Sequence, residues 1–238
     1  MKITAVTTDL FAPRADLPAF IVRHIPTVKE GVVLAVASKL LCLWKGEILP
    51  YESAGQKEEL IKRESAWALK TPLCWLTVKD GMVMTNAGID ESNADNHLLL
   101  LPPNLYELAQ ELRRALQQKW GVKKLGIVIT DSMILPLRAG VIAAAVAYAG
   151  FRGVRDLRGQ TDLFGRRLEV TLINVADSLA TAAALEMGEG NERRPLSVIE
   201  AAPVDFVDEV PPNEIKYPVA HDLYTPLFQA AGYTKKGE

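Results

Sequence analysis

The chain has 238 residues, of which 49% are hydrophobic and 24% charged, with a formal net charge of −2 and an isoelectric point near 6.0. This size and composition are typical of a globular protein with a sizeable core, and the charge balance excludes the basic surface of a nucleic-acid-binding protein or a polybasic membrane patch. The longest apolar or small run, residues 140–151, is too short to span a bilayer, and residues 1–13 lack the apolar stretch of a signal peptide. We therefore expect a cytoplasmic protein without a membrane segment.

The first half of the chain contains apolar segments that predict strands, with two helices between them. The predicted elements are a strand at 2–7, a short helix at 17–24, a strand at 32–37, a second strand at 40–49 and a surface helix at 57–69. The segment 32–37 is continuously apolar, as is typical of a strand covered on both faces. Two further apolar segments, 73–78 and 82–85, flank Lys79-Asp80-Gly81 and predict a hairpin. Cys42 and Cys74 lie in or beside such runs, where buried free thiols are favoured over a disulfide.

The second half begins with the clearest helix of the chain, which we expect Asn104 to cap and Gly121 to end. Its leucines recur at helical spacing, at Leu105, Leu108, Leu112 and Leu116. The elements predicted after it are a strand at 125–130, an alanine-rich helix at 141–149, a strand at 167–175, a helix from the capping pair Asp177-Ser178 to Met187 and a last short strand from 198. Strands are frequent and do not alternate regularly with helices, so the sequence predicts a mixed α+β fold. Pro211-Pro212 marks a C-terminal extension.

Two acid-bearing segments, NAGIDESN at 86–93 and ITDSMILPLR at 129–138, each place a carboxylate just beyond an apolar run. Carboxylates raised on strand ends hold hard divalent cations against phosphate, so Asp90 and Asp131 indicate phosphoryl chemistry. Each has a structural alternative. Asp90 lies among residues that turns use, and Asp131 with the following serine is suited to cap a helix, although Pro136 argues against a helix that starts there.

Further candidate phosphate ligands lie outside the two acid-bearing segments. The loop GEGNERR at 188–194 lacks the ending of a P-loop, but its glycines and arginines could wrap a phosphate; the alternative is a helix C-cap followed by a solvated turn. Ser38-Lys39 at a strand end could contact a nucleotide. The remaining anion-binding candidates are Arg138, Arg155, Arg158, Arg166 and Arg167. Asp162 is expected in a turn, and the three histidines show no metal-ligand spacing.

Taken in chain order, these segments resemble a known family. They are SK at 38–39, NAGIDESN at 86–93, LLLLPPN at 98–104, ITDS…PLRAG at 129–140, RDLRGQTDLFGRRLEVT at 155–171 and ADSLATAAALEMGEGNE at 176–192. This set is similar to the coenzyme F-420:L-glutamate ligase family, and most of all to its bacterial branch assigned to folate metabolism. The resemblance extends over residues 2–206. It implies one γ-glutamyl ligase domain at 1–206, which could comprise two interleaved subdomains, followed by a C-terminal extension at 207–238.

The resemblance also implies an activity, cofactors and partners. A member of this family is an intertwined homodimer of α+β fold with mainly antiparallel sheets. It uses GTP or ATP to activate a substrate carboxylate as an acyl phosphate, which the amine of L-glutamate then attacks to form a γ-glutamyl amide. Two divalent ions, Mg²⁺ or Mn²⁺, bridge the phosphates. The implied acceptor is a folate-type compound or the deazaflavin precursor F-420-0, with the folate type favoured by the PLR and EGNE segments.

The site residues that the resemblance implies fall on two groups of positions. The metal ligands fall on Asp90, Asp131, Ser132 and Glu189, of which Asp90 and Asp131 are also the catalytic residues. The nucleotide contacts fall on Ser38, Lys39, Asn93, Met187, Gly188, Glu189, Gly190, Asn191, Glu192, Arg193 and Arg194.

The sequence departs from the pattern of this family at two places. Leu43 occupies the position of a nucleotide-binding lysine, which Lys45 could replace if both lie on one strand in the expected register. The segment DSMILPLR keeps the proline and arginine of the folate-like branch but has Met133 and Ile134 in place of polar residues. The alternative to an active ligase is therefore a nucleotide- or metabolite-binding homologue without ligase turnover.

Overall fold

The computed structural model describes residues 1–211 and 213–233, and the chain divides into two compact units. The first unit consists of Met1–Ile48 and Leu99–Glu214, and the second of Leu49–Leu98 together with the described residues from Ile215 onward. The mixed α+β fold that the sequence predicts is confirmed, and most strand pairs are antiparallel. None of the helices described is long and apolar enough to cross a membrane.

A five-stranded sheet forms the centre of the first unit, in the order β1-β12-β2-β8-β9. Its strands are β1 (Lys2–Val6), β2 (Val32–Ala37), β8 (Leu125–Met133), β9 (Ile142–Ala149) and β12 (Leu196–Glu200). Every neighbouring pair is antiparallel except β2 and β8, which run parallel from Val32↔Leu125 to Ala37↔Thr130. The carboxyl ends of β2 and β8 therefore meet at one edge of the sheet, where the sequence places Ser38 and Asp131.

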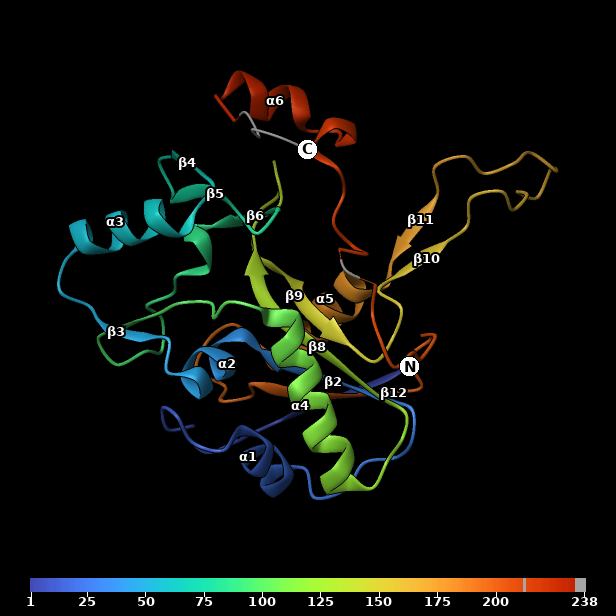
Figure 1. Cartoon of the computed structure of the whole chain (residues 1–238), viewed down its shortest axis with the longest axis horizontal. Helices are drawn as coiled ribbons and strands as arrows, with labels where there is room; N and C mark the ends of the chain where they lie inside the picture. The colour runs from blue at the N-terminus through green and yellow to red at the C-terminus, as the bar shows by residue number, and fades with distance from the viewer. Residues whose placement is uncertain (212, 234–238) are drawn as a thin grey trace. The chain divides into compact units, whose positions relative to one another are not determined.

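Helices cover both faces of this sheet, which explains why β2 is apolar along its whole length. The helices of the first unit are α1 (Leu17–His24), α2 (Ser38–Lys45), α4 (Leu105–Trp120) and α5 (Val175–Met187). In Figure 1, α4 passes in front of β8 and β2, whereas α5 lies behind the sheet. The helices expected at 17–24 and after Asn104 are confirmed, as is the strand at 32–37. The expected side-chain cap at Asn104 is wrong, because this residue is left-handed (φ 58°) and makes no capping hydrogen bond.

Strand β9 corrects the prediction of a helix at 141–149. Alanine has the highest helix propensity, but propensity is a weak preference that tertiary packing overrides. Seven of the eight residues of β9 are buried, between β8 and the helices α4 and α5. Small side chains let these helices approach the strand closely, so the alanines here serve the packing of a covered strand.

Helix α2 corrects the prediction of a strand at 40–49. Short apolar runs do not distinguish a buried strand from a buried helix by composition alone. Here Leu40, Leu41 and Cys42 are buried, and the helix ends at Gly46, which is left-handed (φ 75°). A short strand, β3 (Ile48–Pro50), follows and pairs with β7 (His97–Leu99).

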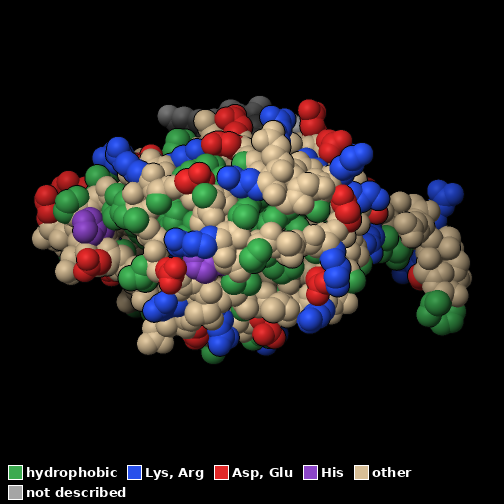
Figure 2. All heavy atoms as spheres, turned by 90° about the horizontal axis from the view of Figure 1, so that it is seen from below, with side chains coloured by type: hydrophobic (Ala, Val, Ile, Leu, Met, Phe, Trp, Pro, Cys, Tyr) green, Lys and Arg blue, Asp and Glu red, His purple; other side chains and the backbone are tan. Residues whose placement is uncertain are grey.

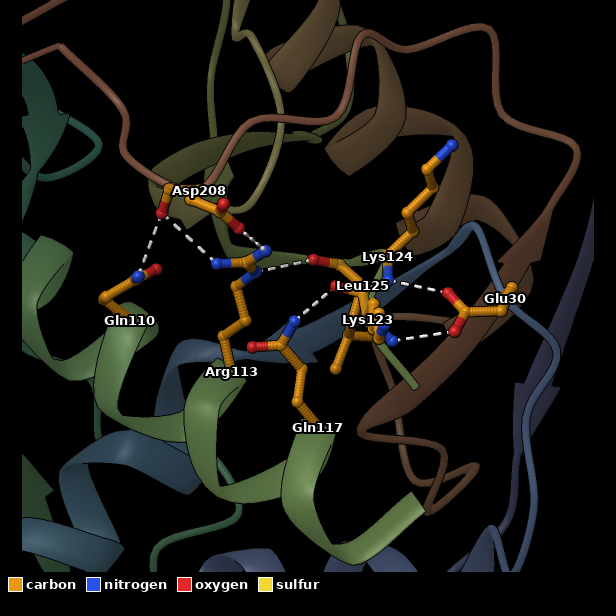
Figure 3. A network of polar contacts seen from close by, with 8 residues as sticks. All are labelled: Glu30, Gln110, Arg113, Gln117, Lys123, Lys124, Leu125 and Asp208. Carbon is orange, nitrogen blue, oxygen red and sulfur yellow. Dashed lines mark hydrogen bonds and ion pairs between the residues drawn. The ribbon is translucent and has the colours of Figure 1, made fainter. Parts of the chain in front are cut away.

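A network of polar contacts fixes α4 against the start of β8 (Figure 3). The buried Arg113 donates from Nε to the carbonyl oxygen of Leu125 at 2.8 Å and from Nη2 to the carboxylate of Asp208 at 3.1 Å. The carboxylate of Glu30 accepts from the backbone N–H groups of Lys123 and Lys124 at 2.8 and 2.6 Å. These bonds hold the beginning of the strand that carries Asp131 at its other end.

A β-ribbon projects from the first unit after β9. Strands β10 (Val154–Asp156) and β11 (Leu172–Asn174) pair antiparallel and lead into the loop between them, which we call the arm, residues 157–171. Figure 1 shows the arm extending away from the sheet of the first unit. The strand expected at 167–175 is thus shorter than predicted. Asp162 is the turn residue that the sequence predicts, since its carboxylate accepts from the N–H groups of Phe164 and Arg166.

The second unit is built around a three-stranded antiparallel sheet. Its elements are α3 (Ala54–Glu64), β4 (Trp67–Lys70), β5 (Trp75–Lys79), β6 (Met82–Thr85) and the 3₁₀ turn η1 (Asn86–Gly88), followed near the C-terminus by η2 (Val219–His221) and α6 (Thr225–Ala230). The expected hairpin is confirmed by β5 and β6. The helix predicted at 57–69 instead ends at Glu64, and its last residues belong to β4. The rings of Trp67, Phe228 and Tyr233 contact one another and attach the C-terminal segment to this unit.

Candidate active site

Asp131 lies beside Ser38 at the carboxyl ends of two parallel strands. Because Ala37 is in register with Thr130, the residues that follow them, Ser38 and Asp131, are neighbours. The buried hydroxyl of Ser38 donates to Oδ1 of Asp131 at 2.9 Å. The alternative role of Asp131 as a helix N-cap is excluded, since the residue lies within β8, which continues to Met133. The fold thus brings two of the candidate site residues into direct contact.

Ser132 and Glu189 form a second pair next to the first. The Ser132 hydroxyl donates to Oε2 of Glu189 at 2.7 Å, and both side chains are exposed. Glu189 comes directly after Gly188, the residue that ends α5 with φ 82°. Since consecutive strand residues point to opposite faces, the pairs Ser38–Asp131 and Ser132–Glu189 approach β8 from its two sides.

The loop after α5 supplies carboxylates and anchoring contacts. The N–H of Gly190 donates to Oε2 of Glu192 at 2.8 Å, and a Cβ on Gly188 would lie 2.5 Å from the carboxyl carbon of Glu192. The backbone turn at these glycines is therefore already faced by a carboxylate of the chain itself. Met187, a candidate nucleotide contact, has a buried side chain that belongs to the core.

The two arginines of this loop both donate to backbone carbonyls. The guanidinium of Arg193 donates twice to the carbonyl oxygen of Thr8, at 3.2 and 3.0 Å, and the Thr8 N–H donates back to the carbonyl of Arg193. Arg194 donates to the carbonyl of Glu186 at 3.5 Å. These contacts attach the loop to the segment that follows β1 and to α5, a role that no local pattern in the sequence indicates.

Asp90 lies in the second unit, at the end of a tight turn. The backbone has positive φ at Ala87 and Gly88, as the sequence predicts for the glycine. The carboxylate of Asp90 accepts from the N–H of Ser92 at 2.7 Å and from its hydroxyl at 3.2 Å. Asn93, which follows, is exposed and also left-handed (φ 53°). The turn that the sequence offers as the alternative for this segment is therefore present.

Lys39 and Lys45 lie at the two ends of α2. Lys39 is half-buried in the first turn, next to Ser38. The amine of Lys45 contacts both carboxylate oxygens of Glu111, at 3.0 and 2.9 Å, and lies 3.7 Å from the centre of the Trp44 ring. The idea that Lys45 replaces the lysine missing at Leu43 assumed a strand, and that register argument is wrong because the segment is helical.

Asp177 has a different contact from the one expected for it. The N-cap of α5 is Asn174, whose side chain accepts from the N–H of Asp177 at 3.0 Å. One carboxylate oxygen of Asp177 accepts from the N–H of Ala145 in β9 at 2.8 Å. Burial raises the pKa of Asp177, while the hydrogen bonds from Ala145 and Asn174 oppose this increase.

A cluster of three or more His, Cys, Asp or Glu side chains arranged for a metal is absent from the described residues. Cys42 and Cys74 are free thiols.

Comparison with known proteins identifies relatives of the chain. A model of the F420-0:γ-glutamyl ligase family matches residues 5–201. A protein of Methanopyrus kandleri named coenzyme F420:L-glutamate ligase is 35% identical over 214 residues, which cover 82% of this chain and 84% of the relative. A protein of the same name from Methanosarcina mazei is 31% identical over 220 residues, or 84% of this chain and 86% of the relative.

Relatives from Methanococcus maripaludis have a higher sequence identity over a shorter matched segment. One, also named coenzyme F420:L-glutamate ligase, is 42% identical over 130 residues, which cover 55% of this chain and 52% of the relative. In these matches the chain spans about half the length of its relatives. The family model covers the five-stranded sheet apart from the first residues of β1, both serine–carboxylate pairs and the turn at Asp90. The chain therefore belongs to the F420-0:γ-glutamyl ligase family.

Proposed function

We propose that the protein is an NTP- and divalent-metal-dependent ligase that joins L-glutamate to a carboxylate-bearing cofactor precursor through a γ-glutamyl amide. The observation that carries the proposal is the pair of serine–carboxylate contacts on β8, within the span that the family model matches. The names of the relatives, coenzyme F420:L-glutamate ligase, support a ligase that uses L-glutamate. The acceptor is the deazaflavin F-420-0 or a folate-type compound, and both present a carboxylate to be activated.

The residues of the site have the donor chemistry of a hard divalent cation. Asp131 and Glu189 contribute carboxylate oxygens, Ser38 and Ser132 contribute hydroxyl oxygens, and Mg²⁺ and Mn²⁺ prefer such ligands. We assign Asp131, Ser132 and Glu189 as metal ligands of the first unit and Asp90 as a metal ligand of the second. When bound, Mg²⁺ or Mn²⁺ would neutralise phosphate charge and polarise the phosphoryl group.

The reaction brings anions together, so the side chains act mainly by binding and orientation. In the first step the acceptor carboxylate attacks the γ-phosphorus of GTP or ATP. The bond from this phosphorus to the bridging oxygen breaks, GDP or ADP leaves, and an acyl phosphate forms. In the second step the glutamate amine attacks the acyl carbon, inorganic phosphate leaves, and the amine nitrogen loses its proton to solvent or phosphate.

Each protein group has a defined part in this scheme. The Ser38 hydroxyl orients the Asp131 carboxylate, and the Ser132 hydroxyl does the same for Glu189. Lys39 and the N–H groups of the 187–194 loop are the proposed contacts of phosphate oxygens on the first unit, and Asn93 is a proposed nucleotide contact of the second. Arg193 is a weaker candidate for a phosphate contact, because its guanidinium already donates to the carbonyl oxygen of Thr8.

The test is mass spectrometry of the products formed from L-glutamate, Mn²⁺, GTP or ATP, and either acceptor, with inorganic phosphate measured in parallel. The proposal requires an acceptor heavier by one or more glutamyl units and phosphate release that needs all the components. Tight nucleotide binding by calorimetry, without product from either acceptor, would instead identify a binding homologue that has lost turnover. Leu43 and Met133 are the positions that would explain that result.

We also propose that a second copy of the chain covers the arm. Leu163 and Phe164 at its turn are 98% and 94% exposed, and Val170 is 84% exposed. Hydrophobic side chains gather at the end of this projection in Figure 2, whereas acidic and basic side chains are interspersed over the rest of the face shown. Large exposed apolar side chains on a projecting ribbon are typical of an interface. Analytical ultracentrifugation should show a homodimer that Phe164→Ser weakens, and a wild-type monomer at micromolar concentration would refute it.

A further inference from the structure

We infer that Asp177 and Thr181, one turn apart on α5, are positioning residues that fix the register of α5 on β9 and thereby place Glu189 beside Ser132. Neither residue is in contact with the proposed reacting groups. The inference gives these residues a part in the proposed ligase site, so its catalytic meaning rests on the proposed function. The geometric claim stands on contacts within the first unit.

The two side chains bind two backbone groups of the same strand. Asp177 accepts from the N–H of Ala145 at 2.8 Å, and the Thr181 hydroxyl donates to the carbonyl oxygen of Ala143 at 2.7 Å. Residues four apart lie on one face of a helix, so both contacts come from the face of α5 that packs on β9. Two bonds of opposite polarity, spaced along the strand, define how far the helix can slide.

These contacts coincide with an irregularity of the sheet. The pairs Ile129↔Ala147 and Thr130↔Ala145 leave Val146 as an extra residue, which makes a β-bulge. A bulge leaves part of the ladder unpaired and bends the strand, and bulges are frequent beside active sites. The Ala145 N–H bonds to Asp177, and the next residue along β8 after Thr130 is Asp131. Asp177 therefore supports the bulge directly next to the first serine–carboxylate pair.

Asp177 is held on its other side by the helix cap. Its second carboxylate oxygen accepts from the side-chain amide of Asn174 at 2.6 Å, and the oxygen of that amide accepts from the Asp177 N–H. Both carboxylate oxygens thus have partners from different segments. A charged group withdrawn from water is costly unless it is bonded in this way, and burial indeed raises its pKa. A cap alone would not require the bond to β9.

The position of α5 along β9 determines where Glu189 lies, because Glu189 follows the end of this helix closely. Met187 is the last residue of α5, and Glu189 comes two residues later. A slip of one residue along an α-helix moves its end by about 1.5 Å and turns it by about 100°. The Ser132–Glu189 hydrogen bond of 2.7 Å could not survive such a change. The register of α5 on β9 therefore decides whether the second pair forms.

The test compares Thr181→Val with Thr181→Ser and with Ser178→Ala. Valine removes the hydroxyl at nearly constant volume, and serine restores it. Ser178 lies on the same helix, is exposed, and donates to the carbonyl of Asn174, the N-cap residue of α5. Its alanine variant therefore loses a bond of the same type without loosening the helix from the sheet. Asp177→Asn, which keeps an acceptor for Ala145, and Asp177→Ala form a second matched pair.

Two measurements on the full chain report on position. Hydrogen–deuterium exchange of peptides covering 188–192 and 129–133 should become faster by about five- to tenfold in Thr181→Val and Asp177→Ala, and by less than about twofold in the conservative and control variants. Titration with Mn²⁺ alone, followed by the electron paramagnetic resonance of the free ion, should show weaker binding in the same two variants.

The outcomes separate this inference from the proposed function. Unchanged exchange in Thr181→Val and Asp177→Ala would overturn the inference, as would an equal increase in Ser178→Ala, which would indicate a general weakening of the helix. The expected exchange pattern in a protein that makes no γ-glutamyl product would refute the proposed function and leave the positioning role in place. Formation of the γ-glutamyl product together with unchanged exchange in the variants would support the proposed function and refute the positioning role.

Discussion

The two acid-bearing segments are fixed in different ways. Asp131 lies inside the central sheet of the first unit and accepts a hydrogen bond from Ser38, which is 93 residues away in the sequence. Asp90 lies in the second unit, and its carboxylate accepts from the N–H and hydroxyl of Ser92, two residues along. The position of Asp131 thus depends on the packing of the whole sheet, whereas that of Asp90 is set to a large extent by its own turn.

This difference suggests how the two acids would respond to change. A carboxylate oriented by a buried hydroxyl and a paired strand is preorganised, which is what electrostatic catalysis requires. A carboxylate in an Asx turn keeps its local geometry after many substitutions elsewhere, because the bonds that shape it are close in sequence. Substitutions at Asp131 should therefore cost more activity than equivalent ones at Asp90.

Asp131→Asn is expected to have the largest effect. Asparagine keeps the size of the side chain and an acceptor for Ser38, but it removes the charge proposed to hold a cation, so ligase turnover should fall by about a hundredfold or more. Phosphate release at saturating Mn²⁺ measures this loss. Asp205→Asn, at an exposed carboxylate of the same unit, is the control and should leave turnover unchanged. Full turnover in Asp131→Asn would contradict the assignment.

Asp90→Asn should follow, with a loss of about ten- to a hundredfold and a higher Mn²⁺ requirement. The new amide oxygen can still accept from the Ser92 N–H, so the turn should persist and the melting temperature should stay close to that of the wild type. Asp80→Asn is a matched control, because Asp80 also lies in a turn of the second unit, at φ 51°, a conformation that asparagine tolerates. An equal loss in both variants would remove the special role of Asp90.

The sequence predicted the contact between Ser38 and Asp131 only indirectly. The apolar runs 32–37 and 125–130 were correctly interpreted as covered strands, and the candidates Ser38 and Asp131 lie at or just beyond the ends of these runs. That these strands are parallel neighbours is a property of the folded sheet, which no local pattern encodes. The predictions of a helix at 141–149 and a strand at 40–49 were wrong for a related reason. Short apolar runs take their conformation from the elements that pack against them.

The turn at Asp90 was easier to predict because its signals are local. Asn86 and Gly88 are turn-forming types, and the residues around them do adopt positive φ. The loop at 188–194 was predicted only in part. The end of the helix at Gly188 was predicted, but the hydrogen bonds of Arg193 to Thr8 were not, because they join segments 185 residues apart. Contacts between distant segments are the part of the site that sequence reasoning could not supply.

Glu189→Gln should reduce turnover by about tenfold, less than either aspartate substitution. Glutamine still accepts from the Ser132 hydroxyl, so the contact at 2.7 Å is kept while the charge is lost. Turnover measured as a function of Mn²⁺ concentration should show mainly a higher Mn²⁺ requirement. Glu186→Gln, on the exposed side of α5, is the control. If Glu189→Gln matched Asp131→Asn in severity, the ranking of preorganised over loop-borne acids would fail.

The smallest effect is expected at Glu30, which supports the strand of Asp131 from its opposite end. Its carboxylate accepts from the N–H groups of Lys123 and Lys124, and these hydrogen bonds hold the pKa of Glu30 below its ordinary value. A carboxylate whose pKa is lower in the folded state stabilises the fold above the ordinary value, 4.5, and this contribution is lost as the pH falls through the lower, folded-state value.

Glu30→Gln should therefore lower the melting temperature slightly at pH 7, and the difference from the wild type should shrink as the solution is acidified below the ordinary pKa. Thermal unfolding followed by circular dichroism across this range measures it, with Glu209→Gln as a control at an exposed carboxylate. Turnover at pH 7 should change little, since the sheet still pairs β2 with β8. A difference in melting temperature that grew on acidification would show that the start of β8 does not bind Glu30 as a carboxylate. In that case Asp131 would be positioned by Ser38 and the strand pairing alone.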